Sequence, residues 1–336
     1  MHWSGDQRKR DRSGDQPQES RLSNADALGL ETSARQFSCM EAKSIYPVVC
    51  FGEILWDFLP QGKLPGGAPV NVAYHLKMLG KNPSVISRIG EDDEGKELLE
   101  VFQSKGIDTS FIQQDPEHQT GKVLVELKDN HEVDYEIVRP VAWDFIEWNP
   151  EFISLVTQAR YFVFGSLVAR NSVSRNSLLQ CLENAQTKVL DINLRPPHFE
   201  KQILNELLEK ADILKLNLSE LHLISGSYHL YHSDEDRIEY LQERFKIETI
   251  IVTKGNGGAI LYIHDRFFHH AGYPVRVADT VGSGDAFLAA MLSKLMEGSS
   301  PNEALAFANA LGAYVASCPG GCPNYTVDEV LALMKK

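Results

Sequence analysis

Hydrophobic and polar residues follow two distinct periods along most of this chain. Short apolar runs, such as 161–165, predict buried strands, and stretches with apolar residues three and four positions apart predict helices. Beyond about residue 45 the two kinds of segment alternate. This order predicts an α/β fold, a doubly wound, mostly parallel sheet with helices on both faces. The expected strands are 48–57, 84–88, 161–165, 188–192, 212–216, 248–253, 259–263 and 273–277, and the expected helices include 177–185, 200–211, 218–224, 234–245 and 301–315.

One pair of strands departs from this order. Residues 123–127 and 133–137 alternate apolar and polar positions on either side of a polar turn at Asp129-Asn130. A period of two around such a turn predicts a β-hairpin with one exposed face. We expect this hairpin to stand off the main sheet, within a small β lid made by segments around 59–66 and 121–139.

The first 44 residues lack either period. They are rich in Ser, Asp, Gln and Arg and contain no sustained apolar pattern. Such a composition buries too little apolar surface to offset the entropy of folding. We therefore expect residues 1–44 to be disordered or an extension, and residues 45–336 to form the folded domain.

Composition and charge limit the classes of partner. The 336 residues are 43% hydrophobic, which is enough for one large core, and the formal net charge is −13. We expect no nucleic-acid partner, because binding a phosphate backbone requires a basic stripe and the sequence shows none. No apolar run approaches the ~20 residues of a membrane span, and no signal-peptide core is present, so we expect no membrane partner. The five cysteines have no paired spacing, which favours a reducing, cytoplasmic location.

The stretch 279–287, Asp-Thr-Val-Gly-Ser-Gly-Asp-Ala-Phe, leads into an amphipathic helix that ends at Gly298. Its glycines leave backbone N–H groups bare at the helix start, where the helix dipole also favours an anion. Asp285 in the first turn has two interpretations. It complements the dipole, or it is a general base that takes a proton from a hydroxyl while the amides hold a transferred phosphoryl group. The local sequence leaves both open.

Other polar, glycine-rich stretches also follow predicted strands, and in open α/β sheets ligands collect at the carboxyl ends of the strands. This layout predicts two ligands in one crevice. Asn71, in the first turn of a helix, is either a cap or an amide directed at the hydroxyl groups of a ligand. The chain has no Gly-x-x-x-x-Gly-Lys-Ser/Thr loop, and residues 255–258 lack the spacing of a dinucleotide-binding motif.

Two signatures together resemble the ribokinase-like (PfkB-type) carbohydrate kinases. Gly-Gly-Ala-Pro-Val-Asn at 66–71 and the stretch 279–287 lie about 200 residues apart, with Asn217-x-x-Glu220 between them. The resemblance extends from about Tyr46 to the C-terminus. Residues 52–58 and 191–196 are similar to the bacterial fructokinase branch. The resemblance implies an enzyme that uses ATP and Mg²⁺ to phosphorylate a sugar hydroxyl, converting D-fructose to fructose 6-phosphate.

The resemblance also implies roles for single residues. Asp285 matches the catalytic base, and the amides of Gly282, Ser283 and Gly284 match the anion hole over the γ-phosphate. The expected sugar-binding residues are Asp57, Gly66, Gly67, Asn71 and Arg195. The expected nucleotide-binding residues are Asn217, Glu220, Thr253, Gly255, Gly258 and Asn309, with Glu220 reaching Mg²⁺ through water.

A monovalent-cation site, for K⁺, is implied as well. The matching positions are Asp279, Val281, Ala316 and Gly321. The last loop, 319–323, departs from the family's commoner form with smaller residues, which weighs against K⁺ dependence. In relatives the lid often serves as a dimer surface, so we expect a homodimer, with a small-molecule sugar and ATP as the other partners.

Each assignment has an ordinary structural alternative. Asp57 is then a residue that ends a strand, Glu220 a first-turn helix acid, Arg195 a surface residue and Trp56 a core residue. Other members of the family would act on ribose, 2-keto-3-deoxygluconate or a nucleoside. A hypothesis from a different class is that the chain is a non-catalytic sugar-binding regulator. Asp285 argues against this hypothesis, because a protein that only binds sugar has no use for a base.

Overall fold

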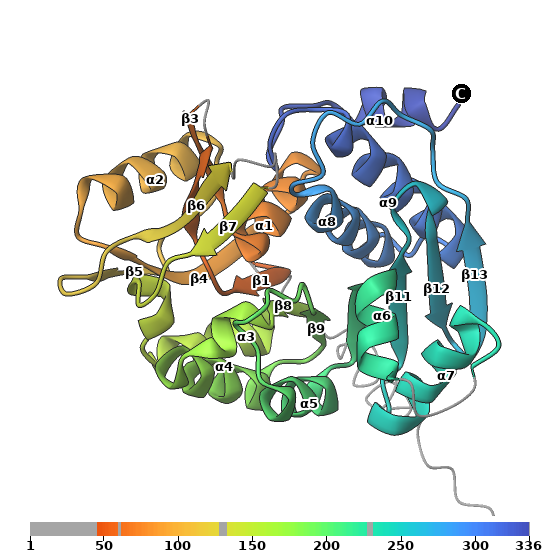
Figure 1. Ribbon diagram of the computed structural model, residues 1–336, viewed down its shortest axis with the longest axis horizontal. Coiled ribbons are helices and arrows are strands. Elements are labelled where there is room, and N and C mark those ends of the chain that lie inside the picture. Colours follow the sequence, from red (N-terminus) through yellow and green to blue (C-terminus); the bar gives the residue numbers. More distant parts are fainter. Residues whose placement is uncertain (1–45, 60–61, 128–132, 227–230, 336) are drawn as a thin grey trace, which may run out of the picture. The chain divides into compact units, whose positions relative to one another are not determined.

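A computed structural model describes residues 46–59, 62–127, 133–226 and 231–335 (Figure 1). These residues form two sheets. The main sheet has nine strands in the order β13-β12-β11-β10-β9-β8-β1-β4-β5. In chain order these are β1 (Val48–Phe51), β4 (Pro83–Gly90), β5 (Ile112–Asp115), β8 (Tyr161–Gly165), β9 (Lys188–Asp191), β10 (Ile213–Asn217), β11 (Thr249–Thr253), β12 (Ala259–Ile263) and β13 (Arg266–His270).

Seven neighbouring strands of this sheet, from β11 to β5, run parallel, and only β12 and β13 are antiparallel. Helices cover both faces, so the parallel strands are near-continuous apolar runs and not alternating ones. The expected doubly wound α/β fold is therefore confirmed. One face packs against α1 (Ala68–Met78), α8 (Ser283–Met296) and α9 (Pro301–Ala316), and the other against α3 (Glu151–Gln158), α4 (Ser172–Asn184), α5 (Lys201–Lys210), α6 (Leu218–Ser225) and α7 (Asp234–Phe245).

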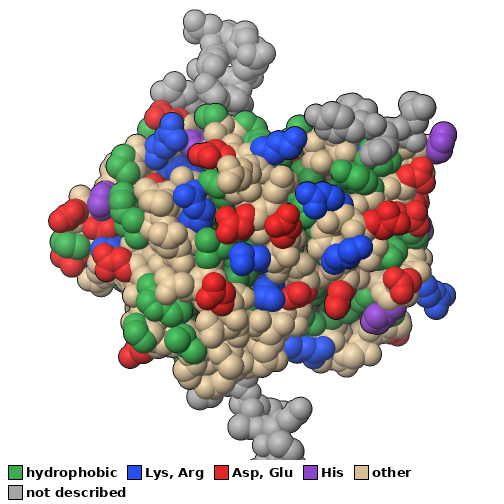
Figure 2. Space-filling model, turned by 90° about the horizontal axis from the view of Figure 1, so that it is seen from below, with side chains coloured by type: hydrophobic (Ala, Val, Ile, Leu, Met, Phe, Trp, Pro, Cys, Tyr) green, Lys and Arg blue, Asp and Glu red, His purple; other side chains and the backbone are tan. Residues whose placement is uncertain are grey.

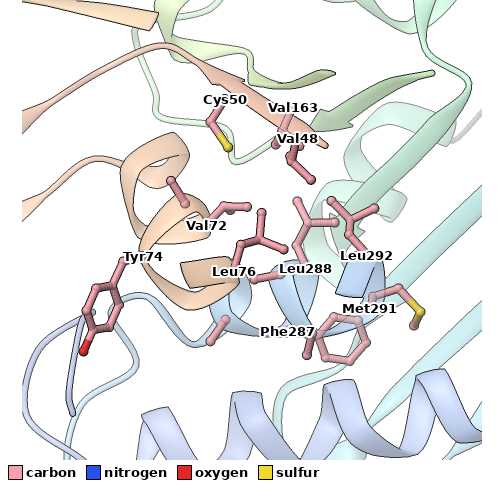
Figure 3. Close-up of a cluster of buried hydrophobic side chains, with 14 of the residues drawn as sticks. Val48, Cys50, Val72, Tyr74, Leu76, Val163, Phe287, Leu288, Met291 and Leu292 are labelled. Carbon is pink, nitrogen blue, oxygen red and sulfur yellow. The ribbon is translucent and has the colours of Figure 1, made fainter. Parts of the chain in front are cut away.

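Figure 3 shows the core beneath the first of these faces. Side chains of the strands, such as Val48 and Val163, meet Leu76 of α1 and Leu288 and Leu292 of α8, and all are almost fully buried. Burial of side chains of this size contributes roughly 1.5–3 kcal/mol each. This packing fixes the starts of α1 and α8 side by side at the carboxyl ends of the strands.

The expected single strand 48–57 is two strands in two different sheets. β1 ends at Phe51, and β2 (Leu55–Leu59) belongs to the second sheet. A continuous apolar run does not reveal where a chain leaves one sheet for another, so this prediction was wrong. Trp56 is a core residue, since it is 2% exposed and its indole N–H donates to the Glu94 carbonyl.

The expected strand 273–277 is also wrong. The residues after β13 follow an irregular path until α8 begins, and Val277 is 57% exposed. Alternating apolar residues form a strand only when a neighbouring strand is there to pair with them. Here the backbone N–H groups of Ala278 and Asp279 donate instead to the Ala316 carbonyl at the end of α9.

The second sheet is small and has the order β3-β2-β6-β7, with β3 (Gly62–Gly66), β6 (Gly121–Leu127) and β7 (Val133–Ile137). β6 and β7 form the expected antiparallel hairpin off the main sheet. Its turn at 129–130 lies outside the described residues, as do residues 1–44. β2 joins the hairpin by pairing in parallel with β6 and antiparallel with β3.

Most other expected elements are shifted by one to five residues. The helix expected at 177–185 is α4, which begins earlier because the Asn171 side chain accepts a hydrogen bond from the Val173 N–H and caps it. The strands β5 and β13 and the helices α3 and α10 (Val327–Leu333) were not predicted from the sequence, and α2 (Asp93–Ser104) is the acidic-started helix that was expected to run to Gly106. Within the described ranges, no helix is both long and apolar enough to cross a membrane. Figure 2 shows acidic and basic side chains mixed over the face seen from below.

Candidate active site

The start of α8 is built on a left-handed glycine. Gly282 is the N-cap residue with φ of 72°, and a Cβ atom added there would lie 2.4 Å from the Cα of Gly321. Only glycine fits both the conformation and the close approach of the 319–323 loop. No side chain caps this helix start, although the Ser283 N–H has a long, 3.3 Å hydrogen bond to the Thr280 carbonyl.

Asp285, in the first turn of α8, is 7% exposed and points at α1. Its Oδ2 atom accepts a 2.8 Å hydrogen bond from Nδ2 of Asn71. Asn71 Oδ1 in turn accepts from the Cys322 thiol at 3.2 Å. Asn71 is therefore not the cap of α1, whose N-cap residue is Gly67. The structure brings together two residues that are 214 positions apart in the sequence.

Burial raises the pKa of Asp285 to about 6, and the charges of Lys215 and Arg195 partly oppose this rise while Asp191 adds to it. A carboxylate with a pKa slightly below neutral suits general-base catalysis, because it is ionised at neutral pH and still accepts a proton. The environment of Asp285 therefore favours the general base over a residue that merely complements the helix dipole.

Lys215, which was not predicted as a site residue, lies beneath this helix start. Its Nζ donates a 2.6 Å hydrogen bond to Oδ2 of Asp191, and both side chains are buried. A Cβ atom added at Gly284 would lie 2.8 Å from that Nζ. Burial works against the charged form of Lys215, but Asp191, Asp285 and Glu220 outweigh it and raise the pKa. The sequence contains one sign of this residue's importance, because a lysine within the mostly apolar predicted strand 212–216 must be paired when it is buried.

A second group of acids lies where the chain passes from β1 to the small sheet. Glu53 is 3% exposed, and burial raises its pKa to about 7. Its Oε1 accepts from the Ala68 N–H at the start of α1 at 3.3 Å, and its Oε2 has no hydrogen-bond partner among the described residues. Burial raises the pKa of Asp57 to about 6, and Arg195 counteracts this rise.

Gly66 and Gly67 pass so close to these two acids that a larger residue would collide with them. A Cβ atom at Gly66 would lie 2.4 Å from Oδ2 of Asp57, and one at Gly67 would lie 2.3 Å from the Glu53 carbonyl oxygen. Asp57 lies in the middle of β2 and does not end a strand. Arg195 is exposed, and it is close enough to lower the pKa values of Asp57, Glu53 and Asp285. Glu53, Asp57, Arg195 and Asp285 are therefore close enough to influence one another's charge.

Asn217 and Glu220 form a capping box at the start of α6. Glu220 accepts the Leu194 N–H at 2.7 Å on one oxygen and the Asn217 N–H at 2.8 Å on the other. The structure thus supports the ordinary alternative, a first-turn helix acid. Each carboxylate oxygen keeps a second lone pair, so Glu220 fits a hydrogen bond from a metal-bound water better than direct ligation.

The remaining nucleotide candidates follow β11 or lie on α9. The Thr253 hydroxyl donates to the Leu216 carbonyl at 3.5 Å, and Gly255 and Gly258 both adopt positive φ, 58° and 79°, around a short 3-10 turn. Asn309 is buried, and its Nδ2 donates to the Leu305 carbonyl of its own helix at 2.8 Å. The side-chain amide of Asn309 therefore makes a hydrogen bond within α9.

The candidates for a monovalent-cation site join two loops. Asp279 accepts the Val281 N–H at 3.0 Å and the Gly320 N–H at 3.1 Å, which ties the stretch before α8 to the 319–323 loop. The Ala316 carbonyl already accepts two backbone N–H groups, and the Gly321 carbonyl lies 2.9 Å from Nε2 of His75. In the part of the chain that the structure describes, no three His, Cys, Asp or Glu side chains gather as metal ligands.

The chain was compared with known proteins. The model of the pfkB family of carbohydrate kinases matches residues 60–327. Fructokinase-1 of Oryza sativa subsp. japonica is 30% identical in an alignment of 318 positions that covers 86% of this chain and 97% of that protein. Fructokinase of Salmonella typhimurium is 31% identical in an alignment of 269 positions that covers 75% of this chain and 85% of that protein.

Among solved structures, the fructokinase of Xylella fastidiosa with bound ATP superposes with a TM-score of 0.75 at 24% identity, covering 86% of this chain and 98% of that one. At this identity the likeness concerns the fold alone. The family match covers well over half of the chain. This protein belongs to the pfkB family of carbohydrate kinases and is an ATP-dependent sugar kinase.

Proposed function

We propose that this protein phosphorylates D-fructose at its 6-hydroxyl, with ATP as the phosphoryl donor. The observation that supports this most is the buried Asp285 carboxylate, held by Asn71 at a helix start that no side chain caps. Its relatives in bacteria and plants that are named fructokinase, at about 30% identity, support fructose as the acceptor.

In the proposed reaction, the sugar hydroxyl oxygen attacks the γ-phosphorus of ATP. The bond from that phosphorus to the bridging oxygen breaks, ADP leaves, and the hydroxyl proton passes to Asp285. Such a transfer requires alignment and charge stabilisation more than covalent catalysis. The amides of Gly282, Ser283 and Gly284 stabilise the charge that grows on the transferred group.

Mg²⁺ supplies further charge neutralisation at the phosphates when it is bound. Glu220 fits water-mediated contact with it, as described above, and Oδ1 of Asp191 is a buried acceptor without a hydrogen-bond partner in the described ranges. We place K⁺ outside the proposed mechanism, because the Ala316 carbonyl already accepts two backbone N–H groups.

The sugar is proposed to lie between the two sheets. Asp57 and the free Oε2 of Glu53 accept hydrogen bonds from its hydroxyl groups, and Arg195 donates at the rim. In this proposal the small sheet covers the sugar as a lid and excludes water, which otherwise competes with the sugar for the phosphoryl group. The strands β3 and β7 form the two edges of the small sheet, and neither has a further neighbouring strand among the described residues. Such an open edge supports a homodimer formed by pairing of strands.

A coupled assay of ADP release tests the substrate. The purified protein is given Mg²⁺, ATP and, in turn, fructose, ribose, 2-keto-3-deoxygluconate and a nucleoside. We expect fructose to give the highest kcat/KM. A higher kcat/KM with another acceptor would replace fructose in the proposal. Sugar binding without ADP release for any acceptor would favour the non-catalytic regulator.

A further inference from the structure

A cavity lies at the side of α5, apart from the catalytic residues. It encloses about 70 Å³ between the short helix η2 (Leu167–Arg170), the turn at 197–199 and the first turns of α5. A single water molecule needs roughly 10–15 Å³ on this measure, so the cavity has room for several waters or for one small ion. Neither Asp285 nor the sugar-site candidates are among the described residues that line it.

Arg170 provides the clearest sign that this cavity takes a ligand. Its side chain is 5% exposed, and its Nε and Nη2 donate to the two oxygens of Asp144 at 2.7 and 2.8 Å. Its guanidinium also stacks on the Trp143 ring at 4.0 Å. The third nitrogen, Nη1, is buried and has no hydrogen-bond partner among the described residues. A charged donor buried without an acceptor is costly, and an acceptor in the cavity removes that cost.

Other polar groups line the same cavity. Nδ1 of His198 is buried and has no partner in the described part of the chain, and it donates to a ligand in the tautomer that carries the proton on this nitrogen. Arg139 also lines the cavity and is exposed to solvent. α5 has no side-chain cap and no acid in its first turn, so its N–H groups and dipole also favour negative charge.

The acids near this cavity leave it open to an anion. Asp144 is occupied by Arg170, and Glu200, the one acid among the described lining residues, is exposed to solvent. The other walls are apolar, with Ala169, Phe199 and Leu207 among them. We propose that this cavity is an oxyanion-binding site formed by Arg139, Arg170 and His198, which takes the phosphate or carboxylate group of a small molecule.

The cavity adjoins the chain segment that bears Arg195. The Ser166 hydroxyl, in the cavity wall, donates to the Ile192 carbonyl at 2.6 Å, and the His198 N–H donates to the Arg195 carbonyl at 2.7 Å. A bound anion therefore holds the segment 192–198 in place and lowers the KM for the sugar. This consequence rests on the proposed function, whereas the binding itself does not.

Calorimetric titration with phosphate and, separately, with succinate tests the site. The titrations are made with the catalytic site filled by Mg²⁺ and a non-hydrolysable ATP analogue, and sodium chloride of equal ionic strength is the reference. Two variants target the cavity: Arg139→Gln at its exposed side, and Arg170→Lys, which keeps a cation beside Asp144 but removes Nη1. Arg244→Gln on the exposed face of α7 is the matched control.

We expect saturable binding of at least one of the two anions and a loss of affinity of about tenfold or more in both cavity variants, the size expected for a hydrogen bond to a charged group. The control variant should bind as the parent does. Binding of phosphate or of succinate shows whether the site takes a phosphate group or a carboxylate group. No saturable binding beyond chloride, unchanged affinity in Arg139→Gln, or an equal loss in Arg244→Gln would overturn the proposal. Because binding is measured directly, this result is independent of whether fructose is the substrate.

Discussion

Asp285 is subject to two opposing influences on its pKa. Removal from water favours the neutral acid, and the nearby cation of Lys215 favours the carboxylate. The result, about 6, leaves the group ionised at neutral pH. Neither influence is visible in the local sequence around 279–287, because Asn71, Asp191 and Lys215 come from distant parts of the chain.

Replacing Asp285 with Asn should lower kcat by about 10²–10⁴, because the amide cannot take the hydroxyl proton. Binding of ATP and of the sugar should persist. The coupled assay measures kcat, and calorimetry measures the two affinities. Asp328→Asn, an exposed change of the same kind in the first turn of α10, is the control. Near-parent turnover in Asp285→Asn would contradict the role of this residue as the base.

The pH dependence of kcat follows from the same pKa. A base acts only when it is deprotonated, so kcat should fall as the pH drops through about 6 and should be level above it. A stopped assay at constant ionic strength from pH 5 to 8 measures this profile. A rate that is constant down to pH 5 would show that proton transfer to a group with this pKa does not limit turnover.

The elements around the site depend on a few unusual positions. α8 lies between two glycines with almost the same conformation, Gly282 with φ of 72° at its start and Gly298 with φ of 75° beyond its end. A Cβ atom at Gly298 would contact nothing within 4 Å, whereas one at Gly282 would collide with the backbone of Gly321. Substitution of Gly298 therefore measures only the cost of the strained backbone conformation. Substitution of Gly282 adds the cost of displacing the 319–323 loop.

We predict that Gly298→Ala lowers the free energy of unfolding by roughly 1–2 kcal/mol, the cost of a left-handed alanine, and leaves kcat unchanged. Gly282→Ala should carry the same cost and also displace the 319–323 loop, which lowers kcat by at least about tenfold. Urea denaturation and the coupled assay measure the two quantities. Equal kcat in the two variants would mean that the contact between Gly282 and Gly321 does not position the anion hole.

β10 contains a second unusual position, Lys215, whose partner Asp191 ends β9. Lys215→Met should lower the free energy of unfolding by about 3–5 kcal/mol, because it leaves the Asp191 carboxylate buried without its cation. Lys215→Met combined with Asp191→Leu should recover much of this loss, since no charge then remains unpaired. Denaturation curves of the parent and both variants measure the effect. A single variant as stable as the parent would show that Asp191 has another means of compensation.

For the molecule as a whole, residues 44–336 form a single compact unit. Within it β1 pairs with β4 on one side and β8 on the other, so it is an interior strand of the main sheet. The N-terminal boundary of the kinase domain should therefore lie just before β1.

We expect a chain that begins at Ser44 to keep the kcat, KM and melting temperature of the full chain. A chain that begins at Gly52 lacks β1 and should not fold cooperatively. Calorimetric melting and the coupled assay compare the three. A loss of activity in the 44–336 chain would assign residues 1–43 a role in the enzyme.

Most of the main sheet was predicted from the sequence because its parallel strands and amphipathic helices have strong periods. The bounds of α7 and β12 agree with the prediction to the residue. The split of 48–57 into β1 and β2 was missed because apolar residues in both sheets look alike along the chain. The strand at 273–277 was wrong because a period of two does not reveal whether a pairing partner is present.

The sequence by itself determined the α/β class, the small second sheet and the resemblance to a kinase family, because these follow from periods and short motifs that are local along the chain. Only the tertiary structure decided which side chains meet: Asn71 with Asp285, Lys215 with Asp191, and Arg170 with Asp144. Burial, charge pairing and pKa depend on neighbours in space. Folding brings these neighbours together from residues that lie as many as 214 positions apart.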